Sequence, residues 1–328
     1  MKAIRNHEDG GLDVLRYEDA PQPEPGPGQV LIRLHAASVN HLDVWVRKGM
    51  PSAPKPHIFG SDGAGTVEAL GDGVDGLAVG DRVVINPGIE KGPVITVFGE
   101  HGDGTHAEFV AIDAVQVFAL DDALSFEVAA AFPLVYETAY RMLVTRAQAR
   151  AGEWALIWGV GGGVGTAAFE ICRALGVQTI VTSGSDAKLE KAREWGADVC
   201  VNHASGDVVA AVKEATDGGV DVVVESVGEA TWARSLAAVR PAGRVVVCGA
   251  TSGPNPPAQL HRFWWKQLTV LGSTMGTRDD FLGAYELVRT GRARVHVDRV
   301  YPLAEARAAH ERLEAGEQLG KIVLAIPG

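Results

Sequence analysis

The chain has 328 residues, of which 46% are hydrophobic, and its formal net charge is -11 at pH 7. This length predicts two domains with sizeable cores. The negative charge argues against nucleic acid or an anionic membrane surface as a partner, although it permits a local basic pocket for a phosphorylated cofactor. The chain has no run of membrane-spanning length, and residues 1–14 lack an apolar signal core, so we expect a cytoplasmic protein.

Residues 1 to about 115 are rich in short β-patterned runs and turn signals, at 30–34, 65–69, 81–85 and 107–110. These runs predict a small, mostly antiparallel barrel or sandwich. The three cysteines, Cys172, Cys200 and Cys248, all lie later in the chain, well separated and in apolar surroundings. They are interpreted as buried small residues and indicate neither a disulfide framework nor a metal cluster.

From residue 154 onward, apolar strands alternate with helical patterns, which is typical of an α/β fold with a parallel, doubly wound sheet. The predicted strands are 154–158, 179–182, 199–201, 220–224, 244–247 and 268–271. A β pattern returns at 320–324, so we expect the first domain to recruit the C-terminal segment. The predicted domains are residues 1–121 with 295–328, and residues 122–294.

A glycine-rich run, 159–165, lies between the first of these strands and a helical pattern at 166–175. Val160 breaks the Gly-x-Gly-x-x-Gly pattern, but Gly159, Gly162 and Gly165 fit a small-x-x-Gly-x-x-Gly variant. Glycines allow a tight turn and a close approach to phosphates, and the helix N-terminus presents free N–H groups to an anion. The order of strand, turn and helix therefore favours a dinucleotide pyrophosphate site over a flexible loop. Its contacts would include Gly163 and Val164.

Taken in order, several segments resemble the medium-chain dehydrogenase/reductase superfamily over nearly the whole chain. They are Val39-Asn40-His41-Leu42-Asp43, Gly60-Ser61-Asp62-Gly63-Ala64-Gly65, Gly80-Asp81-Arg82-Val83, Gly104-Thr105-His106-Ala107-Glu108-Phe109 and Gly162-Gly163-Val164-Gly165. The sequence is most similar to quinone oxidoreductase-like reductases and to chains labelled zinc-type alcohol dehydrogenase. The resemblance implies a GroES-like β-rich catalytic domain and a Rossmann domain with a six-stranded sheet. It also implies hydride transfer between a nicotinamide cofactor and a carbonyl, an alcohol or an activated double bond, with the substrate in the cleft between the domains.

The chain departs from the zinc enzymes at their metal ligands, where it has Asn40, Ser61 and Leu134. None of these supplies the thiolate or imidazole that zinc favours, and the cysteine-bearing lobe after residues 86–88 is replaced by a shorter segment. We therefore expect no metal. A residual site of His41, Asp43, His57 and Asp62 ranks below the reading that His57, His101 and His106 are partly exposed polar residues.

Without zinc, hydrogen-bond donors must stabilise negative charge on the substrate oxygen. The resemblance puts Asn40 beside the nicotinamide as the donor and Asp43 nearby as an orienting acceptor. Equally, Asn40 could be a helix N-cap and Asp43 a carboxylate at a helix N-terminus. Tyr136 and Tyr140 are alternative proton donors, although packing is the commoner role of such residues. Leu42 replaces the proton-relay hydroxyl of the zinc enzymes, which weighs against alcohol oxidation.

The residues at the end of the second Rossmann strand indicate whether the protein prefers NADPH or NADH. NAD-dependent relatives carry an acid where this chain has Ser183, so hydroxyl groups and Lys188 would meet a 2′-phosphate. Asp186 fits better as a first-turn acid of the next helix. This favours NADPH, with NADH as the alternative. The resemblance implies further cofactor contacts, although the glycines and small residues among them could be turn formers only. These contacts are Thr138, Val227, Gly228, Gly249, Ala250, Ser273 and, toward the pyrophosphate, Lys321.

The sequence thus predicts a zinc-independent, NADPH-dependent reductase of a quinone or an α,β-unsaturated carbonyl. The alternatives are an NAD(P)-dependent alcohol dehydrogenase and a non-catalytic dinucleotide-binding sensor or structural protein. The segment 263–272 carries two adjacent tryptophans and leads into an apolar strand at the edge of the sheet. Such an edge invites pairing, so we expect a homodimer or a tetramer.

Overall fold

In a computed structural model, which describes residues 1–327, the chain forms two compact units. Unit 1 comprises Met1–Leu134 with Val295–Gly328, and unit 2 comprises Val135–Arg294. The C-terminal segment belongs to unit 1. Residues 122–134 also belong to unit 1 in this division, whereas the sequence placed them with the second domain.

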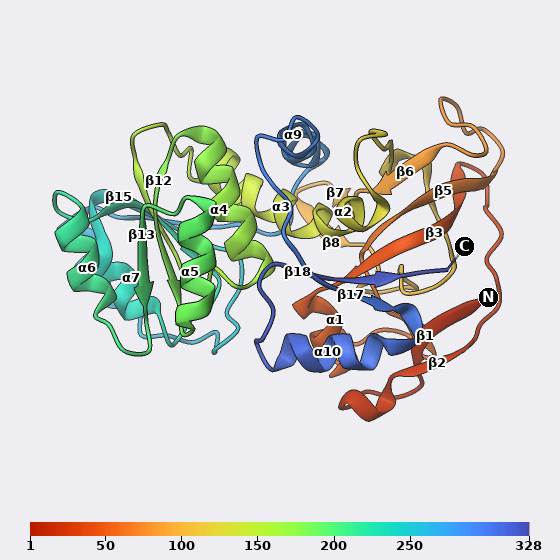
Figure 1. Ribbon diagram of the computed structural model, residues 1–328, viewed down its shortest axis with the longest axis horizontal. Helices are drawn as coiled ribbons and strands as arrows, with labels where there is room; N and C mark the ends of the chain where they lie inside the picture. The colour runs from red at the N-terminus through yellow and green to blue at the C-terminus, as the bar shows by residue number, and fades with distance from the viewer. Residues whose placement is uncertain (328) are drawn as a thin grey trace. The chain divides into compact units, whose positions relative to one another are not determined.

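Unit 1 is built on a seven-stranded sheet with the order β10-β6-β5-β3-β18-β17, and β9 also pairs with β3. Its strands are β3 (Gln29–Val39), β5 (Asp62–Leu70), β6 (Arg82–Ile85), β9 (Phe109–Asp113), β10 (Val117–Ala119), β17 (Val297–Pro302) and β18 (Lys321–Ala325). The pairing is antiparallel apart from the parallel pair of β17 and β18. A mostly antiparallel first domain is thus confirmed (Figure 1).

Two smaller sheets complete the β structure of unit 1. The first has the order β2-β1-β4, with β2 at Arg16–Asp19, β1 at Lys2–Asn6 and β4 at His57–Ile58. The second is a hairpin of β7 (Gly88–Lys91) and β8 (Val94–Val97), which pair in antiparallel register. This hairpin occupies the segment in which the sequence predicted a shortened lobe.

Three α-helices lie wholly within unit 1: α1 (His41–Arg47), α2 (Phe126–Ala131) and α10 (Ala306–Glu314). Helix α2 packs against β3, β5 and β18, which explains why residues 122–134 join this unit. Side chains of β3, β18 and α10 share one apolar core, so a strand near the C-terminus completes a sheet begun near the N-terminus. Short 3-10 turns lie at Leu12–Val14, Ala114–Gln116 and Leu303–Glu305.

Unit 2 contains a six-stranded parallel sheet with the order β13-β12-β11-β14-β15-β16. This is the strand order of a dinucleotide-binding Rossmann fold. The strands are β11 (Trp154–Ile157), β12 (Gln178–Ser183), β13 (Val199–Asn202), β14 (Val220–Glu225), β15 (Val239–Val247) and β16 (Thr269–Gly272). All six predicted strands are present, and β15 begins earlier than the sequence indicated.

Helices of unit 2 follow or flank these strands, and α4 and α5 pack on β12 (Figure 1). They are α4 (Gly163–Leu175), α5 (Asp186–Trp195), α6 (Val208–Ala215), α7 (Trp232–Ala238), α8 (Leu260–Lys266) and α9 (Arg278–Arg289). Helix α3 (Pro133–Tyr140) begins in unit 1 and continues into unit 2, where a π-helical turn at Arg141–Arg146 follows it. Since α4 begins at Gly163, the last glycines of the glycine-rich run form its first turn.

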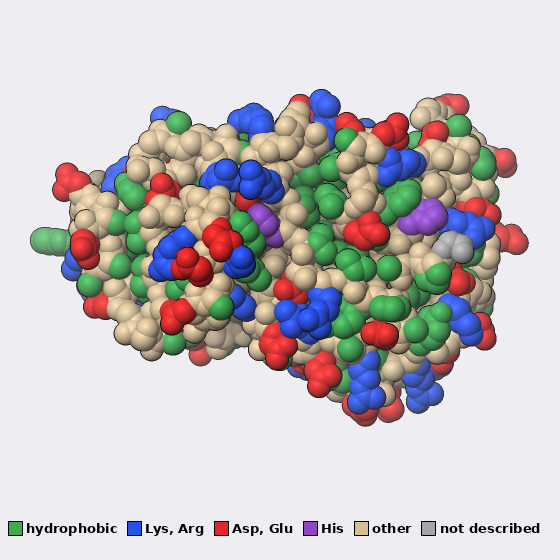
Figure 2. Space-filling model, in the orientation of Figure 1, with side chains coloured by type: hydrophobic (Ala, Val, Ile, Leu, Met, Phe, Trp, Pro, Cys, Tyr) green, Lys and Arg blue, Asp and Glu red, His purple; other side chains and the backbone are tan. Residues whose placement is uncertain are grey.

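Lys and Arg side chains are interspersed with Asp and Glu on the face seen in Figure 2, although the net charge is -11. Within residues 1–327, the helices are too short or too polar to cross a membrane. Cys172 is fully buried, whereas Cys200 and Cys248 are partly buried, and the three thiols are free.

Candidate active site and dinucleotide site

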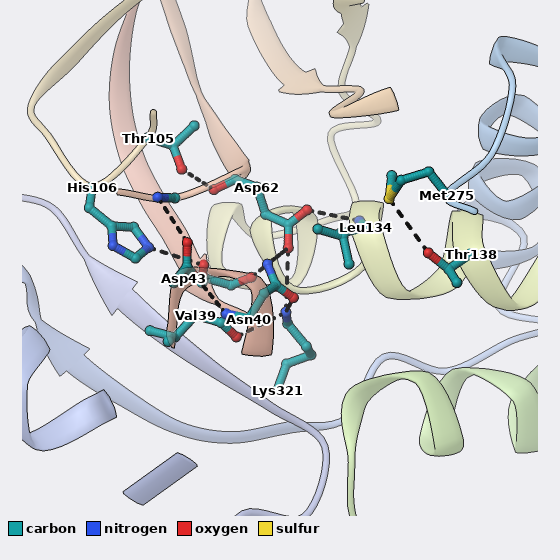
Figure 3. A network of polar contacts seen from close by, with 12 residues as sticks. Val39, Asn40, Asp43, Asp62, Thr105, His106, Leu134, Thr138, Met275 and Lys321 are labelled. Carbon is teal, nitrogen blue, oxygen red and sulfur yellow. Dashed lines mark hydrogen bonds and ion pairs between the residues drawn. The ribbon is translucent and has the colours of Figure 1, made fainter. Parts of the chain in front are cut away.

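Three polar side chains from distant parts of the chain meet inside unit 1 (Figure 3). Asn40 follows β3, Asp62 begins β5 and Lys321 begins β18, and each is at most 5% exposed. The Nδ2 of Asn40 donates to Asp62 Oδ2 at 2.8 Å, and Lys321 Nζ donates to Asn40 Oδ1. Lys321 Nζ lies 3.4 Å from Asp62 Oδ2, which makes a buried ion pair. The antiparallel pairing of β3 with both β5 and β18 brings these ends together.

Asp43 holds the backbone around this cluster. Its Oδ2 accepts from the Asn40 backbone N–H at 2.7 Å, and its Oδ1 accepts from the Gly60 N–H at 3.0 Å. Burial raises the pKa of the Asp43 carboxyl, while His106, this hydrogen bond from Asn40 and Lys321 act in the opposite direction. The Asp43 carboxylate thus accepts from two backbone N–H groups near the start of α1 and fixes the backbone at Asn40.

The cluster does not suit a zinc ion. The side chain at the third expected ligand position, Leu134, has no donor atom, and its backbone N–H instead donates to Asp62 Oδ1 at 2.8 Å. A buried ammonium already neutralises Asp62, so a second cation beside it would meet repulsion. Across residues 1–327, His, Cys, Asp and Glu side chains form no group of three or more that could hold a metal ion.

Two histidines differ from their predicted environment. His57 is 1% exposed and His106 is fully buried, so the interpretation of both as partly exposed residues is wrong. His57 packs edge-on against Phe59, and the Nε2 of His106 lies 3.2 Å from the carbonyl oxygen of Ser38. His57 is buried because it lies within β4 (His57–Ile58), whereas the sequence analysis placed it before a strand. The backbone of His106 is held by hydrogen bonds to Phe59 and Ile4. The side chain of His101 is exposed.

In unit 2 the glycine-rich run forms a turn between β11 and α4. Gly159 has a φ of +70°, in the left-handed region, and a Cβ added to Gly165 would lie 2.4 Å from the Gly159 carbonyl oxygen. A Cβ on Gly162, the N-cap of α4, would lie 3.6 Å from that oxygen, so Gly162 is not required for packing within the chain. The first turn of α4, which includes Val164, leaves N–H groups without helical partners, so the turn fits a pyrophosphate.

The carboxyl end of β12 presents hydroxyl groups in place of an acid. Ser183 is 5% exposed, and its Oγ accepts from the Ser185 backbone N–H at 3.1 Å. Asp186 is the first residue of α5, as predicted, and it accepts from the Nδ2 of Asn202. Lys188 is partly exposed in the first turn of α5. These residues could hold a phosphorylated ribose.

His203 lies at the same end of β12, and the sequence analysis did not consider it. Its Nδ1 lies 3.3 Å from Thr182 Oγ1, and its Nε2 lies 3.4 Å from the position that a Cβ on Gly184 would take. Burial and the charge of Arg234 lower the pKa of His203. The available signal was that His203 follows the predicted strand 199–201, because loops after neighbouring parallel strands meet at one edge of a sheet.

The remaining predicted cofactor residues follow β14, β15 and β16. Gly228 has a φ of +90°, and a Cβ there would lie 2.4 Å from the Gly253 carbonyl oxygen, so the turn itself requires this glycine. Val227 donates its N–H to the buried carboxylate of Glu225. Gly249 and Ala250 lie in the loop after β15, where they are partly exposed. The buried Oγ of Ser273 has no hydrogen-bond partner within residues 1–327 and could accept from or donate to a bound cofactor.

Near the start of unit 2, the Oγ1 of Thr138 lies 3.6 Å from the sulfur of Met275 (Figure 3). Met275 has a φ of +46°, which is unusual for a residue with a side chain.

The hydroxyl of Tyr136 donates to the carbonyl of Arg294, and burial raises the pKa of Tyr136 well above its usual value. Tyr136 is thus a packed residue with an occupied hydroxyl, and the ring of Tyr140 lies against Gly283.

Sequence comparison identifies relatives along nearly the whole chain. Residues 26–122 match the family described as alcohol dehydrogenase GroES-like domain, and residues 163–290 match zinc-binding dehydrogenase. A quinone oxidoreductase of Pseudomonas aeruginosa is 35% identical over 329 residues, covering 96% of each chain. A quinone oxidoreductase of Rattus norvegicus is 32% identical and covers 99% of this chain and 97% of its own.

Solved structures agree with these relatives. A structure described as NAD-dependent alcohol dehydrogenase is 38% identical, covers 100% of both chains and has a TM-score of 0.96. A 2-octenoyl-CoA carboxylase reductase in complex with NADP and 2-octenoyl-CoA is 28% identical, covers 96% of this chain and 82% of its own, and has a TM-score of 0.89.

The chain therefore belongs to the medium-chain dehydrogenase/reductase superfamily. It has a GroES-like domain and a Rossmann-type parallel sheet, and it is an oxidoreductase of this superfamily that uses a nicotinamide dinucleotide.

Proposed function

We propose that this protein reduces a quinone or an α,β-unsaturated carbonyl with NADPH and without zinc. The observation that carries the proposal is the buried cluster of Asn40, Asp62 and Lys321, which offers an amide N–H donor where the zinc relatives place a metal ligand. The relatives named quinone oxidoreductase and the reductase bound to an enoyl thioester support the same substrate class.

The bound cofactor would supply the hydride to the β-carbon of the substrate. The residues of the chain bind the cofactor and stabilise the charge that develops on the substrate. Asn40 donates an Nδ2–H bond to the oxygen on which negative charge develops, and Asp43 holds the backbone that carries Asn40. The Gly159–Gly165 turn and the α4 N-terminus hold the pyrophosphate. Water or a side chain in the substrate site then protonates the product.

NADPH as the preferred cofactor rests on the end of β12. Ser183, Lys188 and His203 offer donors to a 2′-phosphate, whereas an acid at position 183 would repel it. The neighbour bound to NADP supports this choice. The neighbour described as NAD-dependent favours NADH as the alternative, as the sequence also allowed.

An NAD(P)-dependent alcohol dehydrogenase is the second candidate, because a solved structure of that description is 38% identical. Leu42, in α1, weighs against it, because an aliphatic side chain cannot relay the proton that an alcohol must lose. The Thr138 hydroxyl, Ser273 and the residues after β14 and β15, which include Ala250, are proposed cofactor contacts for either reaction.

A single set of assays distinguishes quinone or enone reduction from alcohol oxidation. NADPH consumption is followed with 1,4-benzoquinone and cyclohex-2-enone, and NAD+ or NADP+ reduction is followed with primary and secondary alcohols. We expect turnover in the first set to exceed turnover in the second. Faster alcohol oxidation would replace the proposal with the alternative, and tight NADPH binding without turnover in either set would indicate a dinucleotide-binding sensor.

The assembly we propose is a homodimer, in which the edge strand β16 of one chain pairs with β16 of another, or a tetramer built from such dimers. Val270 of this strand is 41% exposed, and the neighbouring Trp264 and Trp265 are 67% and 84% exposed. Exposed apolar edges of this kind favour strand pairing. A cytoplasmic location is part of the same proposal.

A further inference from the structure

The two ends of the Asn40 side-chain amide have opposite partners. Lys321, which can only donate hydrogen bonds, faces Oδ1, and the Asp62 carboxylate, which accepts them, faces Nδ2 at 2.8 Å (Figure 3). All three side chains are at most 5% exposed, so water cannot readily replace either partner. The surroundings of Asn40 thus distinguish its oxygen from its nitrogen.

Turning the amide over would break both contacts. Nδ2 would then face the ammonium of Lys321, which is also a donor, and Oδ1 would face the carboxylate of Asp62, which is also an acceptor. A buried polar group without a partner costs about 1–3 kcal/mol, and more when the neighbouring group is charged. One orientation of the amide is therefore strongly favoured, with one Nδ2 hydrogen directed to Asp62 and the second left over for another acceptor.

The three ammonium hydrogens of Lys321 all have acceptors within the protein. Its Nζ donates to the carbonyl oxygen of Val39 at 3.1 Å, to Asn40 Oδ1 and to Asp62 Oδ2 at 3.4 Å. An ammonium has three hydrogens, so these acceptors use all of them. Lys321 is the residue for which the resemblance implied a pyrophosphate contact, but here its charge points into the interior of unit 1.

Asp62 is held in turn by the surrounding backbone and side chains. Its Oδ2 also accepts from Ser38 Oγ at 2.8 Å, and its Oδ1 accepts from the Leu134 N–H at 2.8 Å. Burial is the largest influence and lowers the pKa of Lys321 overall, while Asp62 and Asp43 act in the opposite direction and the ion pair with Asp62 favours the charged form. A positive charge one hydrogen bond away from Asn40 polarises the amide, which strengthens Nδ2 as a donor.

We propose that Lys321 is a positioning residue for the reaction: it fixes the orientation of the Asn40 amide so that an Nδ2 hydrogen is always presented to the substrate oxygen. This inference rests on the proposed function, in which Asn40 is the donor to that oxygen. Lys321 itself touches neither substrate nor cofactor.

The first test replaces Lys321 with Met, with the reactions of 1,4-benzoquinone and cyclohex-2-enone as probes. We expect kcat to fall by roughly tenfold to a hundredfold with little change in KM for NADPH, because the lost contact supports charge in the transition state. Lys321→Arg should recover most of the loss, since a guanidinium donates to the same oxygen. Lys48→Met, at an exposed lysine paired with Glu314, is the matched control and should leave kcat unchanged.

A double-mutant cycle then asks whether Lys321 acts through Asn40. If it does, Lys321→Met combined with Asn40→Ala should be no slower than Asn40→Ala alone. Multiplicative losses would mean that the two residues act separately and would overturn the inference, as would an increased KM for NADPH in Lys321→Met, which would restore the pyrophosphate role. Lys321→Gln, which leaves a neutral donor beside Asp62, replaces the Met variant if the latter does not fold.

A readout that is independent of turnover separates this inference from the proposed function. The side-chain amide of Asn40 gives a pair of proton resonances in the 15N-labelled protein, identified by their loss in Asn40→Ala. We expect these resonances to shift and broaden in Lys321→Met, as the amide samples both orientations, and to stay in place in Lys48→Met. Unchanged resonances would overturn the inference even if the enzyme reduces quinones. Shifted resonances in a protein that reduces neither probe would overturn the proposed function alone.

Discussion

At the scale of single residues, Asn40 and Asp43 make different hydrogen bonds at the N-terminus of α1. Asn40 occupies the N-cap position of α1 and forms a capping box with Asp43, while its side-chain amide also contacts Asp62 and Lys321. Asp43 reaches back to the Asn40 N–H. Because capping uses the oxygen end of the amide and the Asp43 carboxylate, the Nδ2 hydrogens of Asn40 are not used by the helix.

The cofactor preference is also decided by a single residue. Ser183→Asp adds a carboxylate at the buried end of β12, where it would repel a 2′-phosphate and accept hydrogen bonds from an unmodified ribose. We expect NADPH affinity to fall by roughly tenfold or more, which corresponds to about 1.5 kcal/mol or more, while NADH affinity rises. Fluorescence titration with both cofactors measures this.

Ser205→Asp, which adds the same charge at an exposed loop position after β13, is the control for that titration. It should change the two affinities much less. Unchanged NADPH affinity in Ser183→Asp would show that the ribose does not lie at the end of β12.

At the scale of elements, β16 and α8 of unit 2 have no buried residue. Helix α8 has no buried residue, and β16 pairs with β15 along one side while Thr269, Val270 and Gly272 are exposed. The apolar side chains Leu260, Trp264 and Trp265 of α8 are exposed as well. Surface of this kind is costly to leave in water, which favours a second chain as its cover.

Val270→Pro tests the edge strand. Proline removes one N–H from the ladder and fixes φ, so it should prevent β16 from pairing with a second chain. We expect the unmodified protein to be a dimer or tetramer at micromolar concentration and the variant to be a monomer or an aggregate. Light scattering after size-exclusion chromatography distinguishes these states. A monomeric unmodified protein would contradict the proposed assembly.

At the scale of the whole molecule, the buried histidines give unit 1 a specific sensitivity to acid. Burial lowers the pKa of His57 to about 4, with Lys55 and His106 acting in the same direction and Asp103 in the opposite one. The unfolded chain, in which His57 has its ordinary pKa of 6.5, therefore binds more protons than the folded chain between these values. The stability that neutral His57 provides is present above pH 6.5 and is lost as the pH falls toward 4.

The loss from His57 alone is at most about 3 kcal/mol. We expect urea unfolding of unit 1 to shift to lower denaturant between about pH 7 and about pH 5, and His57→Phe, which keeps an aromatic ring beside Phe59, to reduce that shift. His101→Phe, at an exposed histidine, should leave it unchanged. An identical pH dependence in His57→Phe would refute this assignment.

Metal content is a property of the whole chain as well. Because Asn40, Ser61 and Leu134 stand where the zinc relatives bind their metal, we expect the purified protein to contain less than stoichiometric zinc and chelators to leave its activity unchanged. Elemental analysis after dialysis gives the answer. One firmly held zinc per chain would contradict the proposed mechanism.

Patterns that are local in sequence were sufficient for much of this protein. Apolar runs that alternate with helical patterns predicted all six strands of the Rossmann sheet, and the glycine spacing predicted the turn at 159–165. Strands, turns and helix ends depend on residues close together in the chain. The absence of zinc-type ligands at Asn40, Ser61 and Leu134 was also readable from the sequence. So was a strand near residues 320–324, which corresponds to β18.

Only the tertiary structure brought together residues that are far apart in the chain. The pairing of β3 with β5 and β18 places Lys321 against Asn40 and Asp62, at separations that no sequence spacing reveals. The burial of His57 depends in the same way on the pairing of β4 with β1. Side-chain hydrogen bonds and burial are set by long-range packing, so the local sequence could identify Asn40 as a candidate but could not predict its partners.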